Sequence, residues 1–72
     1  MYKGIDMQWI SVKDRLPKEI MKPYLVYIEG FSDPDEAIEI SWYDGELQIP
    51  QYPELEKGIT HWMPLPEPPK ER

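Results

Sequence analysis

The chain has 72 residues, of which 31% are charged, and its formal net charge at pH 7 is −6. This length allows one domain with a marginal core, because a domain this small buries only about 60% of its unfolded surface. The absence of cysteine excludes disulfides and thiolate metal sites, and the negative charge opposes direct binding to nucleic acid phosphates. With no signal segment and no apolar run near the roughly 20 residues of a membrane span, we expect a soluble cytoplasmic protein.

The first expected elements are a leader and a short strand. Residues 1–8 carry no clear hydrophobic period and are expected to form a flexible leader. Residues 9–12, with the sequence WISV, combine aromatic and β-branched side chains that favour a strand. Residues 18–22 leave room for at most one helical turn, because Pro23 cannot continue a helix.

The middle of the chain predicts two longer strands. Residues 24–28 are five consecutive aromatic or aliphatic side chains, which indicates a central strand partly covered on both faces. A turn is expected at residues 32–35, where proline presets φ. Residues 37–43 alternate, and we expect the more apolar face of this strand to enter the core. That face carries Ile38, Ile40 and Trp42, and the opposite face carries Glu39, Ser41 and Tyr43.

The last third predicts a hairpin, a loop, a final strand and a stiff tail. Asp44 and Gly45 favour a hairpin turn before a strand at residues 46–49. Residues 50–58 contain two prolines and are expected to form a loop, and residues 59–63 to form the last strand. The proline-rich residues 64–69 should leave the ladder as polyproline II and cover a sheet edge, with Trp62 packed on the proline rings.

Together these elements predict a mostly β fold, either small β or α+β. The expected architecture is a single curled antiparallel sheet or a partly open barrel of about five short strands, with at most one short helical turn. One domain should span residues 9–69, followed by a disordered tail at residues 70–72.

Two motifs resemble those of a known family. They are WISVKDRLP at residues 9–17 and ITHWMPLPEPP at residues 59–69, with weaker matches at residues 25–27 and 42–45. On these motifs the chain is similar to the domain-of-unknown-function family number five-five-one, which is found in small phage and prophage proteins. The resemblance implies a phage or prophage accessory protein of unknown activity, and it transfers no catalytic residue.

The residues themselves indicate binding rather than catalysis. No serine lies in a nucleophile motif, and one histidine without cysteine does not make a transition-metal site. We therefore expect no catalytic residue, no metal and no cofactor. Exposed aromatic side chains are typical of binding hot spots, although the same residues also suit a small core. The candidate binding residues are Trp9, Tyr27, Tyr43, His61 and Trp62; for His61 and Trp62 a structural role is the favoured interpretation.

Two functions remain open from the sequence. The first is a non-enzymatic binding module that modulates a host or phage protein. The alternative is a small-molecule, nucleotide-like binding or sequestering protein that forms a homo-oligomer. Its phosphate contacts would come from Lys13, Arg15, Lys18 and Lys22. Direct binding to nucleic acid or to a membrane is not expected in either case.

Overall fold

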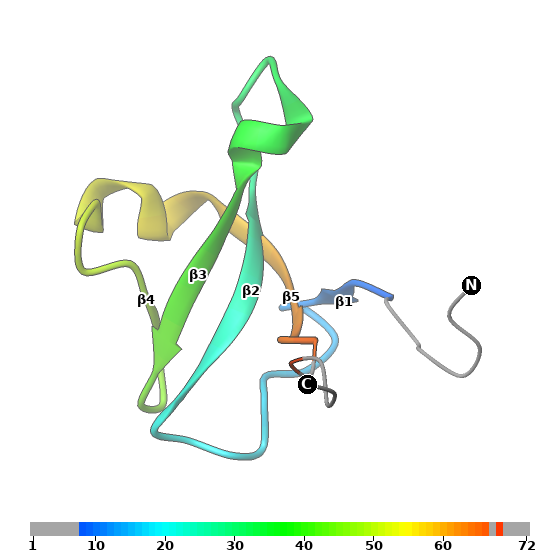
Figure 1. Ribbon diagram of the computed structural model, residues 1–72, viewed down its shortest axis with the longest axis vertical. Coiled ribbons are helices and arrows are strands. Elements are labelled where there is room, and N and C mark those ends of the chain that lie inside the picture. Colours follow the sequence, from blue (N-terminus) through cyan, green and yellow to red (C-terminus); the bar gives the residue numbers. More distant parts are fainter. Residues whose placement is uncertain (1–7, 67, 69–72) are drawn as a thin grey trace.

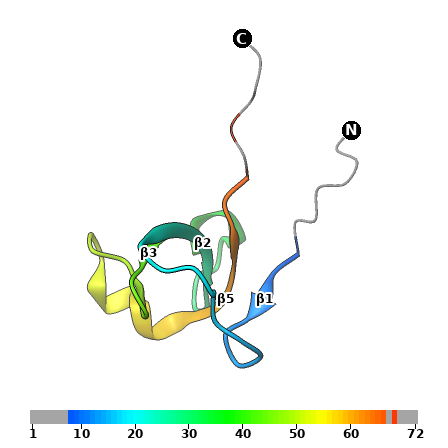
Figure 2. The ribbon, with the colours of Figure 1, turned by 90° about the horizontal axis from the view of Figure 1, so that it is seen from below.

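The computed structural model describes residues 8–66 and 68, which form one antiparallel sheet of five strands in the order β1-β5-β2-β3-β4. The order leaves β1 and β4 at the two sheet edges, so the sheet curls without closing (Figures 1 and 2). This confirms the predicted mostly β fold with a single curled sheet. The strands are β1 (Ile10–Ser11), β2 (Lys22–Ile28), β3 (Ile38–Tyr43), β4 (Leu47–Gln48) and β5 (Ile59–Pro64).

The helical segments are two short 3-10 turns, η1 (Pro34–Ala37) and η2 (Pro53–Gly58). Each begins with a proline, whose fixed φ suits a first turn, and the Asp33 carboxylate caps η1 by accepting from the Asp35 N–H at 3.0 Å. The turn that the sequence allowed at residues 18–22 is absent: Met21 has a φ of 61°, outside the right-handed helical region, and Lys22 already belongs to β2. The expected loop at residues 50–58 instead contains η2.

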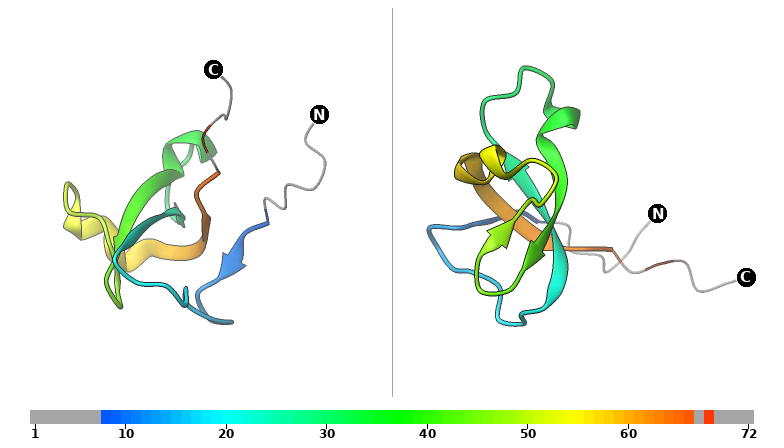
Figure 3. Two further views of the ribbon diagram at one scale, coloured as in Figure 1. Left: turned by 60° about the horizontal axis from the view of Figure 1, so that its bottom comes forward. Right: turned by 90° about the vertical axis from the view of Figure 1, so that its left-hand side faces the viewer.

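The central strand is β2, as the sequence predicts. It pairs with β3 on one side and β5 on the other, and its side chains Tyr24, Val26 and Ile28 are 4%, 0% and 1% exposed. These three define the inner face, around which the sheet curls (Figure 3). The core cluster on this face consists of Tyr24, Val26, Ile28, Tyr43, Ile49 and Trp62.

The predicted orientation of β3 is wrong. Ser41 and Tyr43 are buried, whereas Ile38, Ile40 and Trp42 are 39%, 58% and 39% exposed. The register on β2 sets this orientation, because it places Ser41 opposite Tyr24 and therefore on the inner face. The Tyr24 ring lies edge-on to Tyr43 and Trp62, with ring centroids 5.8 and 5.3 Å away. The small Ser41 side chain leaves room for this aromatic cluster, and the larger apolar side chains of β3 point outward.

The end of β5 also differs from the expectation. Pro64 is still the register partner of Tyr24, so the ladder extends one residue beyond Met63. Because β5 lies between β1 and β2, the tail starts from an interior strand and not from a sheet edge. Residues 1–7 of the predicted leader, Glu67, and residues 69–72 at the other end lie outside the described residues. Within the part that is described, no helix has the length and hydropathy needed to cross a membrane.

Candidate binding surfaces

The side of the sheet away from the core carries a row of apolar side chains, which we call the outer face. It is built from cross-strand pairs of β2 and β3, in which Pro23 faces Trp42, Leu25 faces Ile40 and Tyr27 faces Ile38. All six positions lack a charged side chain, although almost a third of the chain is charged. This composition is therefore not that of the average surface of the protein.

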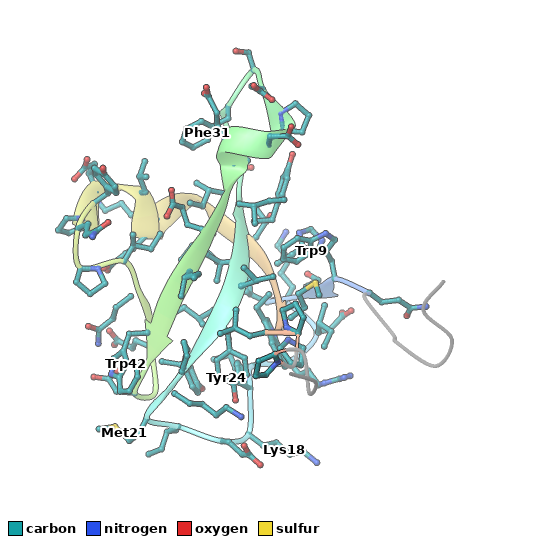
Figure 4. All side chains as sticks on the ribbon, viewed as in Figure 1. Trp9, Lys18, Met21, Tyr24, Phe31 and Trp42 are labelled. Atoms are coloured by element: carbon teal, nitrogen blue, oxygen red, sulfur yellow. The ribbon has the colours of Figure 1, made fainter. Side chains whose placement is uncertain are left out.

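The outer face exposes four large apolar side chains. Figure 4 shows Trp9 near the β1 edge of the sheet and Trp42 near the end of β3, toward the other edge. An aromatic side chain therefore lies near each edge. From the exposed fractions of Trp9, Ile38, Ile40 and Trp42, these four residues expose on the order of 400 Å². The largest apolar patch on a typical monomer spans about 300–600 Å² and is often functional. The outer face is thus a candidate interaction surface.

Three of the predicted binding residues meet at one end of the outer face. The Trp9 ring lies edge-on to Tyr27 at a centroid distance of 5.9 Å, and Tyr27 lies 6.5 Å from the ring of His61. A small hollow of about 190 Å³ opens between the three rings. His61 is half-buried, and its Nδ1 lies 2.8 Å from the Thr60 hydroxyl. The structure therefore assembles Trp9, Tyr27 and His61 into one aromatic cluster.

The other two predicted binding residues, Tyr43 and Trp62, belong to the core. They are 5% and 6% exposed and pack on opposite sides of Tyr24. The indole of Trp62 donates from Nε1 to the Arg15 carbonyl at 2.9 Å. Trp62 therefore anchors the segment between β1 and β2, whereas its predicted packing on the rings of the proline tail stays a prediction.

A second candidate surface is an open pocket of about 490 Å³ beside this segment, which we call the basic pocket. Arg15, Lys18 and Lys22 line it, together with the rings of Tyr24 and Trp62. Lys22 bonds the Glu19 carboxylate at 3.0 Å, and this hydrogen bond and charge raise the pKa of Lys22 above its ordinary value.

Hydrogen bonds from the sheet fix the backbone around the basic pocket. The Tyr24 hydroxyl donates to the Glu19 carbonyl at 2.8 Å, and the Trp62 indole holds the Arg15 carbonyl. Figure 4 shows Lys18, Met21 and Tyr24 at the same end of the molecule. Three of the four expected phosphate contacts thus gather here, whereas Lys13 lines a different hollow beside His61.

Sequence reasoning did not select Ile38, Ile40 and Trp42 for the binding surface. Their alternation along β3 is a clear signal, but it predicts burial because isoleucine and tryptophan are usually core residues. The opposite orientation of β3 follows from its pairing with β2, in which the small Ser41 lies opposite the large Tyr24. Among residues 8–66 and 68, no three His, Asp or Glu side chains come close enough to hold a metal ion.

The fold and its surfaces define a small all-β domain with one packed and one exposed sheet face. A family model described as "Protein of unknown function (DUF551)" matches residues 8–70. The chain belongs to this family, as its two motifs predicted. Neither the curated proteins nor the solved structures contain a significant match to the chain.

Proposed function

We propose that this protein is a non-enzymatic binding module that modulates a host or phage protein through the outer face of its sheet. The observation that carries the proposal is the uncharged outer face, on which Ile38, Ile40 and Trp42 of β3 are exposed beside the half-buried Leu25 of β2. The largest exposed apolar patch of a monomer is often functional. The phage or prophage origin of the protein and its location in the bacterial cytoplasm are inferred from the family resemblance.

Site-specific photo-crosslinking tests this proposal. A photoreactive phenylalanine analogue at Ile40 should capture one protein in the bacterial host, because Ile40 is the most exposed apolar side chain of the outer face. The matched control is the same analogue at Glu54, an exposed residue of η2. Capture at Ile40 and not at Glu54 supports the proposal. Equal capture at both positions, or none at Ile40 in folded protein, contradicts it.

The captured partner then gives a quantitative prediction. Ile40→Glu should weaken its binding at least about tenfold, because a hot-spot residue contributes about 2 kcal/mol or more and a buried carboxylate would remain unpaired. Glu54→Gln should leave the affinity unchanged. Titration calorimetry with the purified partner measures both values. An Ile40→Glu variant that binds like the wild type would place the interface elsewhere.

A second function, binding of an anionic nucleotide-like molecule, is favoured by the basic pocket. Its volume of about 490 Å³ lies within the usual range of about 300–1,000 Å³ for ligand pockets. Arg15 and Lys18 supply positive charge to its lining, in which Tyr24 and Trp62 are largely buried. Arginine and lysine are side chains that recognise phosphate.

A panel of nucleotides tests the second function by thermal unfolding. A ligand present at 100 times its Kd should add about 2.7 kcal/mol of stability, which raises the Tm of a domain of this size by roughly 10–20 °C. Arg15→Ala combined with Lys18→Ala should abolish the shift, whereas Lys13→Ala should preserve it. A panel without any shift in Tm would remove this function from consideration.

A further inference from the structure

The outer edge of β3 is only partly covered by β4. The two strands pair at Trp42↔Gln48 and Tyr43↔Leu47 alone. Continued in the same register, the next hydrogen-bonding partner of Ile40 would be Pro50, which has no N–H to donate to the ladder. The N–H of Ile49, which this register directs away from β3, donates to the Glu56 carboxylate at 2.8 Å. Proline therefore ends the pairing and leaves residues 38–41 as an open edge of the described sheet.

The backbone groups of Ile40 point toward this open edge. Residue pairs in an antiparallel ladder alternate between hydrogen-bonded and non-hydrogen-bonded. Pro23 cannot donate, so its pair with Trp42 is of the non-hydrogen-bonded kind, and so is the pair Leu25–Ile40 two residues along. The N–H and C=O of Ile40 are therefore directed away from β2. An open edge of this kind is a template for another strand.

Two hollows flank the open edge, and both are apolar and acidic. One, of about 460 Å³, is lined by Glu39, Ile40 and Trp42 on β3 and by Ile49 and Pro50 after β4. The other, of about 370 Å³, lies between η1 and η2, where Asp35 and Glu36 line it with Glu39 on one side and Tyr52 and Leu55 on the other. Neither hollow has a Lys or Arg in its lining. The edge thus offers backbone groups, apolar contacts and uncompensated negative charge side by side.

We propose that the β3 edge binds an extended segment of a partner protein in which apolar residues alternate with Lys or Arg. The inference rests on the proposed function and names the chemistry of the partner. The segment adds a strand beside β3 and bonds the free backbone groups of Ile40. Its apolar side chains extend the outer face beside Ile40 and Trp42, and its cationic side chains lie on the opposite side, near Glu39. Strand addition of this type is a common mode of peptide recognition.

A second copy of the chain fits this edge poorly. A two-fold axis at Glu39 would pair Ile38 of one copy with Ile40 of the other and would set the two Glu39 side chains directly opposite each other. Like charges at this position destabilise a strand pair. An axis at Ile40 would instead require the outward groups of Trp42, which are already paired with β4. A basic partner segment removes both conflicts.

A synthetic peptide tests the proposal on the full chain. The probe is a blocked heptapeptide of alternating lysine and valine, and the controls are its glutamate–valine analogue and a peptide with four lysines followed by three valines. Calorimetry measures affinity, and amide hydrogen exchange by NMR measures protection. We expect the alternating basic peptide alone to bind and to slow exchange at the Ile40 amide at least about tenfold, as a new strand hydrogen bond requires.

A pair of variants checks the charge that recognises the peptide. Glu39→Gln should weaken peptide binding about two- to fivefold, the value of a cross-strand charge pair. Glu54→Gln, which changes an acid of η2 outside both hollows, should have no effect. An equal loss of peptide affinity in the two variants would mean that only the net charge of the protein attracts the peptide. That result would contradict a specific site at β3.

The remaining outcomes separate this inference from the proposed function. Peptide binding without protection at Ile40, or equal binding of the control peptides, overturns strand addition. Failure of all peptides, together with a partner crosslinked at Ile40, overturns the inference and leaves the proposed function standing. Protection at Ile40 in a peptide-free dimer would make a second copy the occupant and overturn the choice of a basic segment.

Discussion

Trp62→Ala should lower the free energy of unfolding by about 3–5 kcal/mol, the range for removal of a buried tryptophan. The indole is 6% exposed, lies edge-on to Tyr24 at 5.3 Å and donates to the Arg15 carbonyl at 2.9 Å. Natural domains have stabilities of about 0.05–0.15 kcal/mol per residue, so this loss removes a large fraction of the total. Urea unfolding followed by far-ultraviolet circular dichroism measures it without relying on tryptophan fluorescence.

A phenylalanine at position 62 separates the two roles of the indole. Trp62→Phe retains much of the aromatic packing but cannot donate to the Arg15 carbonyl, so it should cost about 1–3 kcal/mol. It should also speed amide exchange in residues 13–21, because the hydrogen bond from Trp62 to the Arg15 carbonyl is lost. A cost of Trp62→Ala below about 1 kcal/mol, or unchanged exchange in Trp62→Phe, would contradict the placement of Trp62 in the core.

The second large effect concerns the two faces of the sheet. Ile28→Ala should destabilise the protein by about 2–5 kcal/mol, because Ile28 is 1% exposed and its loss leaves a cavity on the inner face. The matched control is Ile40→Ala on the outer face, where the side chain is 58% exposed. This control should cost no more than about 1 kcal/mol, which is the span of strand propensities.

The same denaturation experiment compares the two isoleucine variants. The difference between their unfolding free energies is the informative quantity, since both substitutions remove the same atoms from a strand. Similar losses at Ile28 and Ile40 would mean that the outer face is covered in solution. That outcome would also weaken the proposed binding role of this face, and analytical ultracentrifugation would then determine whether a second copy covers it.

The sequence predicted about five strands and their positions along the chain because each strand has a local signal. Residues 24–28 are continuously apolar, and the turn at Asp44 and Gly45 uses a residue that readily adopts positive φ, which is 112° for Gly45. The family followed from the motifs at residues 9–17 and 59–69. These features depend on neighbours along the chain, and a single sequence contains them in full.

The face of β3 and the grouping of the basic residues could not be predicted in the same way. Whether Ile40 or Ser41 points inward depends on the register with β2, and that register depends on the space that the Tyr24 ring needs. Likewise, Arg15 and Lys22 meet Trp62 only because β5 lies next to β2 in the sheet. Such relations join residues far apart in the chain, and alternation within one strand carries no information about them.

The pairing of β1 with β5 has a consequence for synthesis of the protein in the cell. Ile10 faces Trp62 across the sheet, so the first strand to leave the ribosome has no partner until the last strand has been made. Contacts of such long sequence separation form slowly, because the intervening chain must first be ordered. Before β5 docks, β2 and β3 are able to form a hairpin, while the aromatic cluster remains incomplete. Tyr24 therefore lacks its edge-on contact with Trp62 until β5 packs beside β2.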